Sequence, residues 1–268
     1  MLQSVLYNQG NNKPAIVALP ALGERKEIYE AMAENLKEFC FLAVDLPGHN
    51  KDAGHDFSIE KYIQELKELL DQLSIEKAHF IGNSIGAWII QSYYKFFSET
   101  VLSITLLDGG YYFIGDYDAG EVEKIELPVI KQIEDLKIAI EQQADSMDLS
   151  SRNKERFKIY LLDNFIQKDG VYIHHSDVNA LQTLSRAITE TNYCLQQDTE
   201  VPVLLLLADQ EKENSEEEKI KSFLLLHKDA TIKLIPNSYH LLAITNPLEV
   251  AAHFKNLVKS LSQKTALL

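Results

Sequence analysis

A serine between two glycines is the strongest chemical feature of the sequence. Residues 82–86 read Gly-Asn-Ser-Ile-Gly, directly after the apolar stretch 78–81 and at the start of an apolar-faced helical pattern. A serine on a sharp turn from a strand into a helix exposes its hydroxyl, and the flanking glycines let the two elements approach closely. The positive end of that helix and the N–H of Ile85 can stabilise an oxyanion. The pattern therefore predicts Ser84 as a nucleophile.

A serine hydroxyl needs a neighbouring base to take its proton. Of the eight histidines, His240 follows the expected strand 232–235 and precedes the last expected helix. Loops at the carboxyl ends of parallel strands form the sites of such sheets, so His240 is the predicted base. His79 lies within an expected strand and is expected to pack there. The pair 174–175 lacks the spacing of metal ligands, so no metal site is expected.

A carboxylate must orient the base and stabilise its imidazolium. Asp209 and Glu211 follow one expected strand, and Asp108 follows another. Either loop could face His240, so the residues alone leave the acid open. Asp209 and Glu211 also belong to an acidic run up to Glu218, which would be solvated in any case.

The elements that position these residues alternate along the chain. Buried strands are expected at 15–19, 39–44, 78–81, 101–107, 203–207 and 232–235. Apolar residues at helical spacing lie between them, most clearly over 59–73, where Ser58 is the expected N-cap. The last helix is expected to begin with Asn246 as its N-cap. Strands that are apolar on both faces and separated by helices indicate an α/β fold, with a mostly parallel sheet covered by helices on both faces.

The stretch 111–197 interrupts this alternation. Its pattern is mainly helical, with many acidic and aromatic residues and no strand pattern strong enough to join the sheet. We interpret it as a helical cap inserted after the fourth expected strand. Residues 1–110 and 198–268 then form the core, and because Ser84 and His240 lie on opposite sides of the insertion, both parts must complete one sheet.

Composition narrows the classes of partner. The 268 residues are 46% hydrophobic and 25% charged, as in an ordinary globular protein. The 26 basic and 40 acidic residues give a net charge of −14, which disfavours nucleic acid. No apolar stretch approaches the ~18 residues of a membrane span, and the first residues do not resemble a secretory signal. Cys40 and Cys194 are expected to be free thiols. We therefore expect a cytoplasmic monomer or homodimer that takes a small-molecule substrate, with no membrane partner and no cofactor.

Several motifs together resemble the α/β-hydrolase superfamily. Residues 82–86 resemble its nucleophile elbow, 45–49 (Asp-Leu-Pro-Gly-His) its D-x-P-G-x-G turn, and 236–240 (Pro-Asn-Ser-Tyr-His) the P-x-x-x-H segment that carries its histidine. The resemblance covers nearly the whole chain outside the insertion, which falls where this family places its cap. It implies a serine hydrolase.

The resemblance also implies roles for individual residues. Ser84 would be the nucleophile and His240 the general base. The family usually writes G-x-x-D after the strand that carries its acid, and Glu211 falls on that position. Some members take the acid from the preceding strand, which would select Asp108. We rank Glu211 first, Asp108 second and Asp209 third.

The oxyanion loop departs from the family pattern. Many members have His-Gly after the first long strand, whereas residues 19–23 read Leu-Pro-Ala-Leu-Gly. An oxyanion hole needs a backbone N–H rather than a particular side chain. Leu22 can therefore donate beside Ile85, although Pro20 has no N–H to give.

Three hypotheses for the function follow. The first is a serine hydrolase that acts on a carboxylic ester, thioester or lactone through an acyl-enzyme, with an apolar or aromatic substrate contacted by residues such as Trp88 and Tyr111. The second is a carbon–carbon bond hydrolase or lyase of the same fold, because the Gly-Asn-Ser form of the elbow resembles such hydrolases and a lyase of the menaquinone pathway. The third is a ligand receptor without catalysis.

Overall fold

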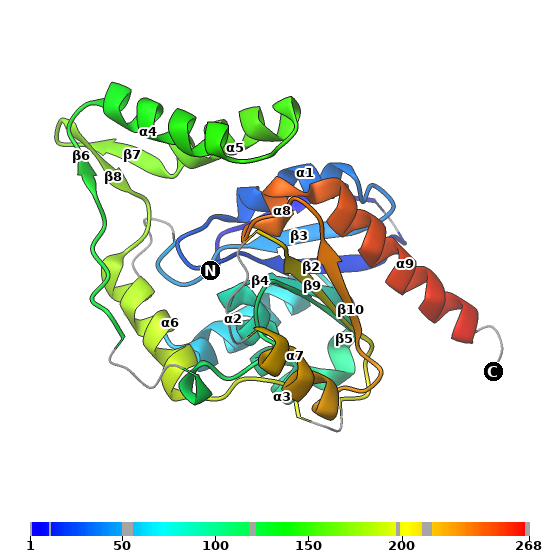
Figure 1. The fold of residues 1–268 in the computed structure, drawn as a ribbon. Helices are drawn as coiled ribbons and strands as arrows, with labels where there is room; N and C mark the ends of the chain where they lie inside the picture. Colours follow the sequence, from blue (N-terminus) through cyan, green and yellow to red (C-terminus); the bar gives the residue numbers. More distant parts are fainter. Residues whose placement is uncertain are drawn as a thin grey trace.

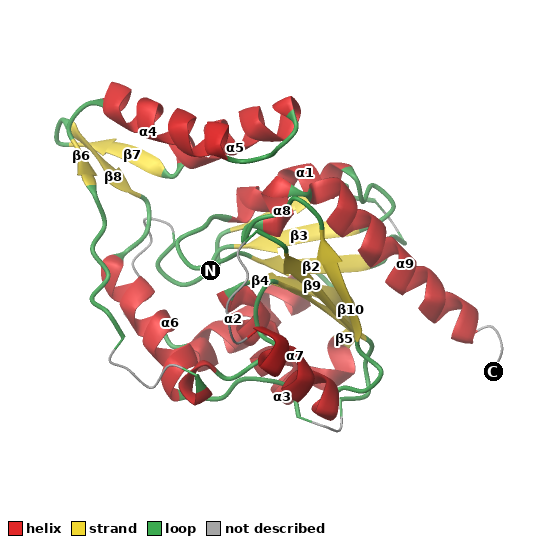
Figure 2. Ribbon diagram, viewed as in Figure 1, coloured by secondary structure: helices red, strands yellow, loops and turns green. Residues whose placement is uncertain are grey.

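The computed structural model describes residues 2–10, 12–49, 56–117, 122–196, 199–210 and 216–265. Within these residues a seven-stranded sheet has the order β1-β3-β2-β4-β5-β9-β10 (Figures 1 and 2). Its strands are β1 (Ser4–Tyr7), β2 (Ala15–Leu19), β3 (Cys40–Val44), β4 (Ala78–Asn83), β5 (Val101–Leu107), β9 (Val203–Ala208) and β10 (Thr231–Ile235). Only the pairing of β1 with β3 is antiparallel in this sheet. The predicted mostly parallel α/β fold is confirmed, with β1 as an additional edge strand.

Helices cover both faces of the sheet (Figure 2). They are η1 (Lys26–Tyr29), α1 (Glu30–Glu34), α2 (Ile59–Gln72), α3 (Ile85–Phe97), η2 (Ser98–Thr100), α7 (Glu216–Leu226), α8 (Leu242–Thr245) and α9 (Pro247–Thr265). Alternate residues of β2 contact opposite layers: Val17 packs with α2 and α3, whereas Ile16 packs with α1 and α9. Both side chains are fully buried, which explains why the strands are apolar on both faces. The expected cap of α2 is also present, since Ser58 Oγ accepts from Lys61 N at 3.3 Å.

The segment between β5 and β9 contains short strands in addition to the expected helices. It contains η3 (Ile114–Asp116), β6 (Val129–Ile130), α4 (Ile133–Ser146), α5 (Ser151–Asp163), β7 (Phe165–Lys168), β8 (Val171–His174) and α6 (Val178–Glu190). The three strands form a small antiparallel sheet of their own, in the order β6-β8-β7. The insertion is mainly helical, as predicted, and none of its described strands joins the main sheet, but the small sheet itself was not predicted. Its strands have at most four residues and are at least partly exposed, so they carry no strong apolar pattern.

A short-range signal for part of this sheet was present in the sequence. Asp169 and Gly170 connect β7 to β8, both with positive φ, at 49° and 81°. Asp-Gly between two strands is the typical two-residue hairpin turn, because both central positions of that turn need positive φ. The hairpin was missed because the turn stands between helices rather than between long apolar strands.

The inserted segment contacts the core at several points. The α4–α5 pair lies above α1 and α8 in Figure 1, and Asn153 of α5 donates to Thr245 O at 2.8 Å. Tyr160 Oη, also on α5, accepts from Arg25 N at 2.8 Å. No described helix is both long and apolar enough to cross a membrane, and Cys40 and Cys194 are both free.

A close approach between α3 and β2 generates the first prediction. A Cβ on Gly86 would lie 2.3 Å from Leu19 O and 2.8 Å from Pro20 O. Gly86→Ala should therefore lower the free energy of unfolding by about 1–3 kcal/mol, because backbone atoms must move to admit the methyl group. Urea unfolding followed by circular dichroism measures the change.

Gly10→Ala is the matched control. A Cβ there meets only the flexible side chain of Lys13, at 3.1 Å, and the change should stay within about 0.5 kcal/mol. Equal stability of the two variants would contradict the close packing of α3 on β2.

Candidate active site

Ser84 occupies a strained turn between β4 and α3. Its backbone angles are φ 51° and ψ −122°, a region that non-glycine residues rarely adopt. Ser84 N donates to Leu107 O at 2.9 Å, which fixes the turn against β5. A Cβ on Gly82 would lie 2.4 Å from Gly86 C, and one on Gly109 would lie 2.7 Å from Ser84 Cα. Glycine at these positions is what makes room for the turn.

His240 and Asp108 form a direct pair beside this turn. His240 Nδ1 lies 2.7 Å from Asp108 Oδ2, and Asp108 Oδ1 accepts from Ala208 N at 2.9 Å. Both carboxylate oxygens are thus engaged, so the carboxylate is held in orientation. A carboxylate at Nδ1 favours a proton on that nitrogen, which leaves Nε2 able to accept one.

The three carboxylates considered from the sequence have different positions. Asp108, ranked second, is the described carboxylate that contacts His240 Nδ1. Glu211, ranked first from its position in a family motif, lies outside the described residues. Asp108 reaches His240 because β5 pairs with β9 and β9 with β10, so the loops after these strands meet at one sheet edge. The contact places Asp108 on His240, and the first rank given to Glu211 stays a prediction.

Asp209, ranked third, holds the loop that carries His240. Its two carboxylate oxygens accept from Asn237 N and Ser238 N, both at 2.9 Å. Asn237 has a positive φ of 51°, and Ser238 Oγ donates to Ile235 O at 2.6 Å. The carboxylate of Asp209 therefore stabilises a tight turn just before the histidine.

Asn83 connects the serine turn to the histidine loop. Its Nδ2 donates to Leu107 O at 3.0 Å and to His240 O at 2.9 Å. The side chain is fully buried, so these two bonds matter for the position of both loops. The sequence singled out Asn83 only for its resemblance to one form of the elbow, and its bond to His240 needed the structure.

One cavity of about 210 Å³ contains the three central residues. It is lined by Ser84, Trp88, Asp108, Tyr111, Tyr112, Ile114, Ile188, Glu216 and His240. The expected substrate contacts Trp88 and Tyr111 both line it, and Trp88 Nε1 donates to Tyr112 O at 2.9 Å. Ile188 of α6 and Glu216 of α7 had no motif in the sequence, because neither belongs to a recognisable pattern of catalytic residues.

The expected oxyanion donors lie on adjacent segments. Ile85 is the first residue of α3, and Leu22 lies in a turn that Glu24 N closes on Ala21 O at 3.1 Å. The close contact of Gly86 with Leu19 O brings this turn next to the start of α3. The two backbone segments are therefore neighbours, as an oxyanion hole requires.

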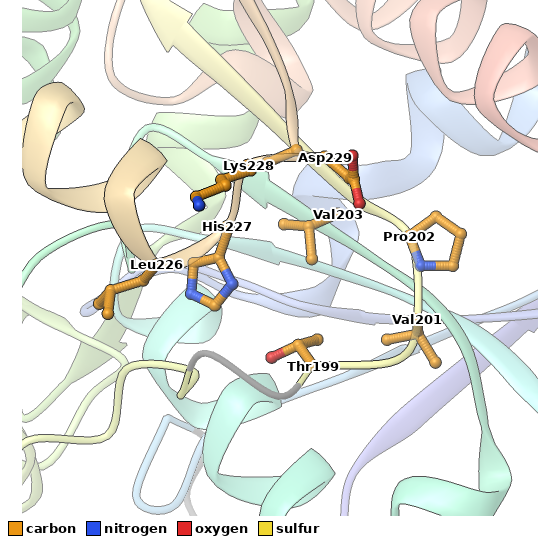
Figure 3. Close-up of a pocket in the computed structure, with 9 residues that line it drawn as sticks. Thr199, Val201, Pro202, Val203, Leu226, His227, Lys228 and Asp229 are labelled. Carbon is orange, nitrogen blue, oxygen red and sulfur yellow. The ribbon is translucent and has the colours of Figure 1, made fainter.

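A second cavity, of about 230 Å³, lies at the opposite edge of the sheet (Figure 3). It is lined by residues at the amino ends of β9 and β10, among them Thr199, Val203, His227 and Asp229. None of Ser84, Asp108 and His240 is among its lining residues. Ser84, Asp108 and His240 line the first cavity instead.

Comparisons with known proteins agree with the fold. A family model described as the alpha/beta hydrolase fold matches residues 14–247. The crystal structure of E-2-(acetamidomethylene)succinate hydrolase superposes with a TM-score of 0.76 at 15% identity, and it covers 97% of this chain and 100% of its own. The chain belongs to the α/β-hydrolase fold family.

Two curated relatives match a shorter stretch. 3-Oxoadipate enol-lactonase 1 of Acinetobacter baylyi is 32% identical over 105 residues, which are 37% of this chain and 40% of the relative. A Bacillus subtilis protein named as a candidate 2-succinyl-6-hydroxy-2,4-cyclohexadiene-1-carboxylate synthase is 28% identical over 100 residues, 36% of each chain. The matches thus span well under half the length of these relatives.

The histidine loop generates the second prediction. Asp209→Ala removes the acceptor of two backbone N–H groups, and hydrogen bonds to a charged group contribute about 1.5–3 kcal/mol each. Because the Asp209 side chain is only partly buried, we expect the lower end for two such bonds, a fall of about 3 kcal/mol in the free energy of unfolding in urea titrations. Asp229→Ala, at an exposed aspartate before β10, is the control and should change stability by less than about 0.5 kcal/mol. Similar values for both variants would contradict the bracing role of Asp209.

Proposed function

We propose that the protein is a serine hydrolase that cleaves a carboxylic ester, thioester or lactone of a small apolar or aromatic substrate through an acyl-enzyme. The observation that carries this proposal is the 2.7 Å contact of His240 Nδ1 with Asp108 Oδ2 in the same cavity as Ser84. A nucleophile, a base and an acid that orients the base are the elements of acyl transfer.

Each residue has a step in the proposed reaction. Ser84 Oγ attacks the carbonyl carbon while His240 Nε2 accepts its proton, and the Asp108 carboxylate stabilises the resulting imidazolium. The N–H groups of Leu22 and Ile85 donate to the carbonyl oxygen as it becomes negative. His240 then protonates the leaving group. Water, deprotonated by His240, attacks the acyl-enzyme and releases the carboxylic acid.

The cavity supports the choice of substrate. Trp88, Tyr111 and Tyr112 form one aromatic wall, in which Tyr111 and Tyr112 are in edge contact with ring centroids 4.9 Å apart. Ile114 and Ile188 add apolar surface. A volume of about 210 Å³ suits a small acyl group. The enol-lactonase named among the relatives acts, by its name, on a lactone, which favours this class of bond.

Carbon–carbon bond cleavage or elimination is the second candidate. It would use the same Ser84 and His240, and it is favoured by the name of the Bacillus subtilis relative and by Asn83 before the serine. A panel of short p-nitrophenyl esters separates the two functions. Rapid turnover supports ester hydrolysis, whereas an inert panel with normal active-site labelling supports the second candidate.

Covalent labelling gives the third prediction. A fluorophosphonate should add once to the wild-type protein, because the serine, histidine and oxyanion donors together activate Ser84. Ser84→Ala should abolish the adduct, as measured by intact mass and peptide mapping. A receptor without catalysis would show no adduct on the wild type, and an adduct at another residue would also contradict the proposal.

The identity of the acid gives the fourth prediction. Asp108→Asn removes the charge that orients His240 and should lower kcat for the best ester by about 10³–10⁴-fold. Glu211→Gln, at the carboxylate that the family motif favours, should stay within about threefold of wild type. The reverse result would assign the acid to Glu211. Circular dichroism of both variants checks that each is folded.

A further inference from the structure

The turn that carries Leu22 has a glycine with an unusual set of partners. Residues 21–24 form a closed turn with Gly23 at its third position, where φ is 83°. A positive φ at that position is typical of a type II turn and suits glycine. The N–H of Gly23 points to His49, and the C=O of Gly23 points to His175. Two imidazoles therefore contact the two peptide groups that flank Gly23.

His49 fixes the N–H of this glycine. Gly23 N donates to His49 Nε2 at 2.7 Å, and His49 Nδ1 lies 2.9 Å from Pro47 O. A ring that accepts at Nε2 must carry its proton on Nδ1, which can then donate to Pro47 O. Burial lowers the pKa of His49 to about 4, and this keeps the ring in the neutral state that the contact requires.

His175 holds the other side of the same residue. Its Nε2 lies 3.0 Å from Gly23 O, and its Nδ1 lies 2.5 Å from His49 O. Burial, with help from His49 and Arg25, lowers the pKa of His175 to about 4, so a neutral ring donates to one of these two carbonyls at a time. His175 thus bridges the turn at Gly23 and the backbone of His49.

This bridge comes from the inserted segment. His175 follows β8 and precedes α6, whose first turn is capped by Asp177. Asp177 N donates to Gly48 O at 2.8 Å, and a Cβ on Gly48 would lie 2.3 Å from Ala180 Cβ. The start of α6 therefore packs directly on the loop that carries His49. One of the contacts between the core and the inserted segment is thus at Gly23, the residue that follows Leu22.

The two histidine rings are enclosed by backbone groups rather than open to substrate. Both ring nitrogens of His49 and of His175 lie within hydrogen-bond distance of backbone groups. Neither residue lines the cavity that contains Ser84. The side chains are also almost completely buried, at 0% and 8% exposed. Their geometry therefore fits the positioning of a backbone segment, rather than proton transfer to a substrate.

We propose that His49 and His175 are positioning residues of the oxyanion hole, which fix the Gly23 peptide groups and thereby the N–H of Leu22. His175 makes the inserted segment part of this support, so the oxyanion loop is held in place only when the start of α6 is docked on the core. Because Gly23 N donates to His49, Leu22 remains the donor of this turn to the substrate oxygen. The inference rests on the proposed function, since the oxyanion belongs to acyl transfer.

Kinetics of paired variants test the proposal. His49→Leu removes the acceptor of Gly23 N and should lower kcat for the best ester by about 10- to 100-fold, with KM changed less than about threefold. His49→Gln keeps an acceptor near the position of Nε2 and should recover most of kcat. His175→Leu should lower kcat in the same direction.

A buried histidine far from the site provides the control. His79 in β4 is 5% exposed, packs against Phe39 and Phe254, and contacts Ser103 Oγ at 2.8 Å. His79→Leu should affect stability without lowering kcat. If His79→Leu lowers kcat as much as His49→Leu does, the effect is one of general stability and the proposal is overturned.

Hydrogen exchange at one amide gives a readout independent of activity. The Gly23 amide should exchange slowly in the wild type, at least tenfold faster in His49→Leu, and at the wild-type rate in His79→Leu. Unchanged exchange in His49→Leu overturns the proposal. If His49→Leu does not fold, the same comparison is made between His49→Gln, which should stay slow, and His175→Leu, which has no donor for Gly23 O and should be faster; equal exchange in these two then overturns it.

The outcomes also separate this inference from the proposed function. A wild type that fails to react with fluorophosphonate refutes acyl transfer, whatever the exchange rate of Gly23. Normal labelling of Ser84, combined with unchanged kcat and slow exchange in His49→Leu, refutes the positioning role alone.

Discussion

The site depends on the backbone of Ser84 remaining at a positive φ. This conformation is unfavourable by about 1–3 kcal/mol for a residue with a side chain, and it persists only where the surroundings enforce it. Here the N–H of Ser84 is bound by Leu107 O at the end of β5. Gly82, Gly86 and Gly109 let three backbone segments approach within distances that a Cβ would prevent. The strained turn is thus held by the packing of strands and helix around it.

His240 and Asp108 are held in position relative to Ser84 by hydrogen bonds to neighbouring backbone and side-chain groups. Asn83, the residue before the serine, donates to His240 O, and Asp108 follows the strand that fixes Ser84. Asp108 in turn accepts from Ala208 N while it contacts His240. Ser84, Asp108 and His240 therefore share a network in which most partners are backbone atoms of β5 and β9. Such a network leaves little freedom for the side chains before substrate binds, which favours catalysis by prior organisation.

The inserted segment contributes residues to the cavity and to the loop beside it. Ile188 of α6 lines the cavity, and His175 contacts the turn next to the expected oxyanion donor. Two arginines of α5, Arg152 and Arg156, pair with Glu34 of α1 instead of facing the cavity. Ion pairs thus attach α5 to the core. Ile188 adds apolar surface to the cavity, and His175 contacts a loop of the core.

Local patterns in the sequence determined much of the fold. Apolar stretches located six of the seven strands in the described sheet. Five of these are almost fully buried, and a strand buried on both faces must be apolar throughout, whereas β10 is buried only at Ile235. The edge strand Ser4–Tyr7 and the small sheet of the inserted segment were missed. Their residues are half-buried or exposed, so burial imposes no pattern on them.

The sequence also determined which serine and histidine to consider, since Ser84 and His240 lie in motifs whose spacing is local. Only the tertiary structure placed Asp108 on His240, although the two residues lie 132 positions apart in the chain. The same holds for His49, His175 and Gly23, which no motif connects. Strand order brings such residues together, and strand order arises from the packing of the whole sheet, which short stretches of sequence do not encode.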